Sequence, residues 1–132
     1  MSFNLAVILR ESAHSSPDRP AALFAQGQLT YGQLDAASDR VAASLAAGGI
    51  RPGDPVALQL PNIPQFLISY FGILKAGAVA VPLNVMLKAP EVAFHLGDCK
   101  ARADHLGRDP GRSRQGSAGC RPRSDLRRRS RR

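Results

Sequence analysis

Residues 55–82 read PVALQLPNIPQFLISYFGILKAGAVAVP, and this stretch decides the fold class. The apolar runs at 56–60 and 78–81 each predict a strand that is buried on both faces. Between them, Asn62 is expected to cap a helix that carries Pro64 in its first turn. This helix is apolar almost all round, so it must pack against something large. A strand, a helix and a second strand in so short a stretch predict a right-handed βαβ crossover, and hence an α/β fold.

Shorter elements flank this unit. Before it, we expect a helix capped by Asn4, two short strands joined at Gln26-Gly27, and a long helix that ends at Gly48-Gly49. The apolar residues of the first helix, Leu5, Ile8 and Leu9, should share one face. Thr30 and Gln33 have the spacing of a capping box, which places the start of the long helix. After the unit, Pro90-Glu91 is expected to begin a short helix that runs to about Leu96.

Charge divides the chain into two parts. Residues 1–99 hold six Lys/Arg and seven Asp/Glu, whereas residues 100–132 hold twelve Lys/Arg and three Asp, which gives the latter a net charge of +9. Residues 102–132 contain almost no large apolar side chains, so they cannot offset the entropy of ordering. We therefore predict a folded domain over 1–101 and a disordered, Arg-rich basic tail over 102–132. No leader or spanning stretch is visible, so a soluble, cytoplasmic chain is expected.

Several fragments in one order resemble the AMP-forming acyl-CoA synthetase (AMP-binding, adenylate-forming) family. They are the strings at 29–31, 52–58, 60–62, 70–79 and 81–84, and the segment 87–98 resembles the fatty-acid-CoA ligases in particular. The resemblance runs from about Asn4 to Ala101. It implies that the chain is a partial N-terminal subdomain of the adenylate-forming fold.

The resemblance also implies a reaction. In this family, a fatty acid attacks Mg-ATP to give an acyl-adenylate, and coenzyme A then displaces AMP. The family's phosphate loop, acidic residues and catalytic lysine have no matching positions here, so we assign no catalytic, cofactor-binding or metal residue. We expect a fragment that binds no cofactor and is inactive alone, while ATP, Mg²⁺ and coenzyme A belong to the full-length family.

The composition changes abruptly after Ala101. The family would continue with an apolar strand, but this chain reads Ala103-Asp104-His105-Leu106. One back-translation of Asp104–Arg108, read in another frame, gives Leu-Ile-Thr-Trp-Ala, which restores a strand-like run. We therefore hypothesise a frameshift near Lys100. A DNA sequence with no better downstream frame would refute it.

The remaining side chains favour ordinary structural roles. The three histidines share no metal-like spacing, and the cysteines form no C-x-x-C pair, so both sets are expected to be structural or incidental. Asp35 and Asp39 are predicted to lie on a solvated helix face. Tyr31 should pack at a helix start, and the aromatic face of the βαβ helix should be core rather than an acyl groove. The residues concerned are His14, His95, His105, Cys99, Cys120, Phe66, Tyr70, Phe71 and Leu74.

Two alternatives to an inactive fragment stay open. The chain could be a small basic protein whose arginine tail binds nucleic acid through phosphates, although the tail has no aromatic side chain to stack on bases. It could also be half of a split enzyme, whose partner is the missing remainder of the synthetase. In either case the βαβ unit lacks most of its sheet, so we expect marginal stability and exposed apolar surface.

Overall fold

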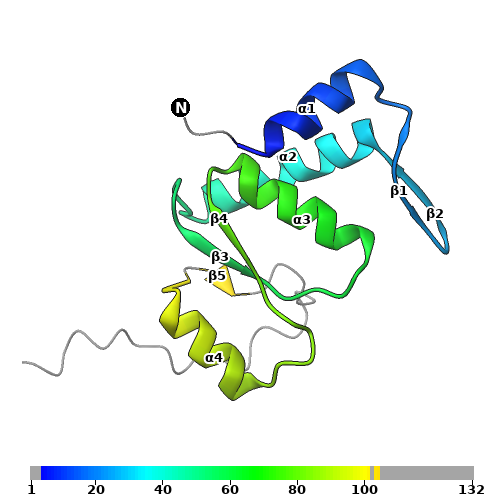
Figure 1. The fold of residues 1–132 in the computed structure, drawn as a ribbon. Coiled ribbons are helices and arrows are strands. Elements are labelled where there is room, and N and C mark those ends of the chain that lie inside the picture. Colours follow the sequence, from blue (N-terminus) through cyan, green and yellow to red (C-terminus); the bar gives the residue numbers. More distant parts are fainter. Residues whose placement is uncertain (1–3, 102, 105–132) are drawn as a thin grey trace, which may run out of the picture.

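The computed structural model describes residues 4–101 and 103–104. Its elements follow the chain as α1 (Ala6–Ser15), β1 (Pro20–Phe24), β2 (Gly27–Thr30), α2 (Tyr31–Ala47), β3 (Pro55–Leu58), α3 (Pro64–Lys75), β4 (Val79–Pro82), α4 (Ala89–Asp98) and β5 (Ala103–Asp104). The first three helices lie on one side of the β4-β3-β5 sheet, α4 lies on the other, and the β1–β2 hairpin projects away (Figure 1). The α/β prediction and the βαβ unit are therefore confirmed.

The core sits where α3 crosses the parallel pair of strands. β3 pairs with β4 from Pro55↔Val79 to Leu58↔Pro82. Its three residues at 56–58 are buried, as predicted for a strand with both faces covered. Val56 and Leu58 pack with apolar side chains of α2 and α3, and Phe66 and Tyr70 lie against this cluster. For these two aromatic residues, the expectation of core packing is confirmed.

Helix α3 approaches α2 most closely at Gly72. Ser69, Gly72 and Ile73 are its buried positions, while the larger side chains around them are only partly covered. A Cβ added at Gly72 would lie 2.5 Å from two side-chain atoms of Val41 on α2. Small residues let helix backbones pack closely, so a pattern based on apolar side chains does not locate this contact.

The capping box at the start of α2 is confirmed. The Gln33 backbone amide donates to the Thr30 hydroxyl over 3.2 Å, and the Thr30 backbone amide donates to the side-chain carbonyl oxygen of Gln33 over 3.0 Å. Thr30→Ala removes one acceptor and is expected to lower the free energy of unfolding by about 1 kcal/mol. Urea unfolding followed by circular dichroism measures this loss. Thr30→Ser keeps the hydroxyl and should unfold like the parent chain; equal losses in both variants would contradict the assignment.

Two local expectations are wrong, the N-cap of α3 and the burial of Val79. The predicted apolar face of α1 is covered only in part, since Ala6 and Leu9 are buried while Leu5 and Ile8 are exposed. The residue at the N-cap of α3 is Ile63, not Asn62, and it makes no side-chain cap bond. Val79 is 52% exposed because β4 lies at an edge of the described sheet.

β5 pairs parallel with β3 beyond the predicted boundary at 101. The rest of the predicted tail, residues 105–132, lies outside the described residues.

Candidate functional site

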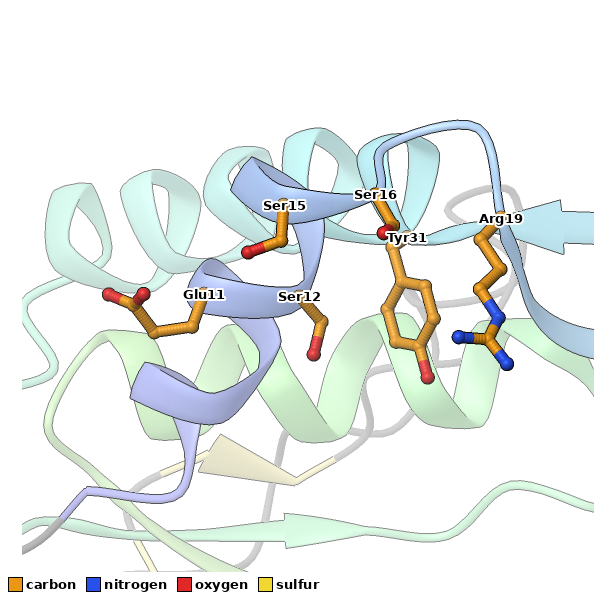
Figure 2. Close-up of a pocket in the computed structure, with 6 residues that line it drawn as sticks. All are labelled: Glu11, Ser12, Ser15, Ser16, Arg19 and Tyr31. Atoms are coloured by element: carbon orange, nitrogen blue, oxygen red, sulfur yellow. The ribbon is translucent and has the colours of Figure 1, made fainter.

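A polar hollow opens between the end of α1, the loop at 16–19 and the start of α2. It encloses about 260 Å³ and is lined by Glu11, Ser12, Ser15, Ser16, Arg19 and Tyr31. Figure 2 shows the Tyr31 ring and the Arg19 side chain side by side at one end, with the Glu11 carboxylate at the other. The sequence analysis did not identify this hollow, because its residues are brought together by the turn after α1.

Backbone hydrogen bonds hold the rim of this hollow in place. The Tyr31 amide donates to the Arg19 carbonyl over 3.0 Å, and the Gly32 amide donates to the Pro17 carbonyl over 2.9 Å. Arg19 lies close to the C-terminus of α1, where a cation interacts favourably with the helix dipole. The Arg19 side chain is exposed, and the nearby helix C-terminus disfavours an anionic ligand. The expectation that Tyr31 packs at a helix start agrees with its place on α2.

Lys75 forms the main charged cluster in the described part of the chain. Its side chain is 2% exposed, and its Nζ donates to an Asp35 carboxylate oxygen over 2.5 Å, to an Asp39 carboxylate oxygen over 2.7 Å and to the Asp35 carbonyl over 2.9 Å. The ammonium has three donors, and all three are used. The cluster therefore fastens the end of α3 to α2 and leaves no free donor for a phosphate.

This cluster corrects the expectation for one of the two aspartates. Asp35 and Asp39 were predicted to lie on a solvated face, and their i, i+4 spacing does place them together on α2. For Asp39 the prediction is confirmed, since its side chain is 56% exposed, whereas the Asp35 side chain is only 24% exposed; both carboxylates bind Lys75. The sequence pattern missed the pair because the lysine comes from another helix, 40 residues along the chain from Asp35.

The carboxyl edge of the sheet is the usual place for a ligand in open α/β folds. Here the side-chain amide of Gln59 donates to the backbone carbonyls of Asn84 over 2.9 Å and Leu87 over 3.3 Å. The Asn84 side chain accepts a hydrogen bond from the Met86 backbone amide. These bonds fasten the segment between β4 and α4 across the end of β3. The polar side chains at this edge thus bind backbone groups of the chain itself.

The histidines and cysteines add no reactive cluster within residues 4–101 and 103–104. His14 lies on α1 and His95 on α4, where its ring meets Phe94 edge to face. Cys99 is half-buried, and its thiol lies 3.9 Å from the Leu96 carbonyl. Across the described part of the chain, no group of three His, Cys, Asp or Glu side chains could hold a metal ion. His105 and Cys120 lie outside the described residues.

Comparison with known proteins identifies the fold. The family described as AMP-binding enzyme matches residues 9–109. The chain belongs to this family. The long-chain-fatty-acid–CoA ligase FadD13 of Mycobacterium tuberculosis is 43% identical over 97 residues, which are 72% of this chain and 19% of the ligase. The salicyl-AMP ligase / salicyl-S-ArCP synthetase of the same species is 45% identical over 82 residues, 58% of this chain and 14% of that protein.

A solved structure agrees with the sequence relatives. The inhibitor-bound N-terminal domain of FACL13 from M. tuberculosis superposes with a TM-score of 0.73 at 40% identity, covering 77% of this chain and 26% of that one. The chain thus spans about a fifth of the length of the long-chain-fatty-acid–CoA ligase FadD13. Within the part of the chain that the structure describes, no helix is long and apolar enough to cross a membrane.

Proposed function

We propose that this chain is a scaffold segment of an AMP-forming fatty-acid–CoA ligase. The parent reaction joins a fatty acid to coenzyme A through an acyl-adenylate, with ATP converted to AMP and pyrophosphate. The observation that carries the proposal is the 43% identity to a fatty-acid ligase over 97 residues, a longer stretch than the 82 residues matched in a salicyl-AMP ligase. ATP, Mg²⁺ and coenzyme A would be bound by the part of the ligase that this chain does not match.

We also propose that the chain does not set the choice of acid. Its identity to a salicyl-AMP ligase, 45%, is as high as its identity to the fatty-acid ligase, 43%. A segment that contacted the acid closely would be expected to differ between a flexible alkyl chain and an aromatic ring. The bonding of Lys75 and Gln59 within the chain supports a scaffold role, because these side chains are already occupied by the fold.

The lone chain is proposed to be inactive. Adenylation requires the phosphates of ATP to be held in line with the acid and their charge to be neutralised by positioned donors. The buried cation of the described part, Lys75, is neutralised by two carboxylates instead. Binding and chemistry would then depend on polypeptide beyond this segment.

Pyrophosphate exchange into ATP tests this proposal directly. The purified chain, with Mg-ATP and dodecanoic acid, is expected to show no acid-dependent exchange above a protein-free blank. Full-length FadD13 serves as the positive control under the same conditions. Exchange that requires the acid and rises in proportion to the concentration of the lone chain would contradict the proposal.

A further inference from the structure

We draw no further inference here: the strongest candidate, the polar hollow between the end of α1 and the start of α2, is lined by side chains that are exposed or half-buried, and nothing in the described part of the chain shows what would bind there.

Discussion

Gly72→Ala is expected to destabilise the chain by about 3 kcal/mol, the upper part of the range for overpacked cores. The added Cβ would lie 2.5 Å from both Cβ and Cγ1 of Val41, and 3.1 Å from the Ser38 carbonyl oxygen. Val41 cannot rotate away easily, since a β-branched side chain on a helix has one strongly preferred rotamer. The two helices must therefore separate, which loosens the core around Ile73. The urea midpoint followed by circular dichroism measures the effect.

Gly97→Ala is the matched control. Gly97 lies on α4, and a Cβ there would meet nothing within 4 Å. Alanine favours a helix over glycine by about 0.5–1 kcal/mol, so this variant should be as stable as the parent chain or slightly more stable. If Gly72→Ala and Gly97→Ala unfold at the same urea concentration, α2 and α3 are not in close contact at Gly72.

Lys75→Met is expected to lower the free energy of unfolding by about 2–3 kcal/mol. The change leaves the Asp35 carboxylate partly buried without its cation and leaves two carboxylates close together on α2. Breaking a fully buried pair costs about 3–5 kcal/mol, and the loss should be smaller here because Asp39 is 56% exposed to screening solvent. Methionine retains most of the alkyl stem, so the loss reports the charge. Urea unfolding at low ionic strength measures it.

Two further variants identify the cause of that loss. Lys88→Met removes a lysine whose side chain is exposed, and it should change stability by less than about 0.5 kcal/mol. Adding Asp35→Asn to Lys75→Met should recover part of the loss, because the unpaired buried charge is then gone. Strictly additive losses in the double variant would contradict a direct Lys75–Asp35 interaction.

The elements predicted well from sequence are those with a local signal. Thr30 and Gln33 mark the start of α2 because the capping box is formed within one turn of helix. The stretch at 55–82 specifies the βαβ unit because its apolar runs mark the two strands, Pro64 marks the start of the helix, and Gly77 follows the end of the helix. The family resemblance stated on residues 4–101 is likewise borne out, since it rests on several short strings in a fixed order.

The features missed from sequence depend on tertiary contacts. The burial of Val79 was overestimated because hydropathy does not tell which neighbours are present to cover it. Lys75 reaches its aspartates only after α2 and α3 have packed, because the lysine and the aspartates lie on different helices. The frameshift near Lys100 and nucleic-acid binding by the basic tail stay predictions, since they concern residues outside the described part or the gene itself.

Binding of a non-hydrolysable Mg-ATP analogue to the purified chain tests the central claim most directly. Calorimetry is carried out at physiological ionic strength, because salt screens the weak attraction between the arginine-rich tail and the phosphates. The scaffold account predicts no saturable binding up to millimolar nucleotide, and no shift in melting temperature. Saturable micromolar binding to the lone chain would contradict it, because this segment would then hold a nucleotide site of its own.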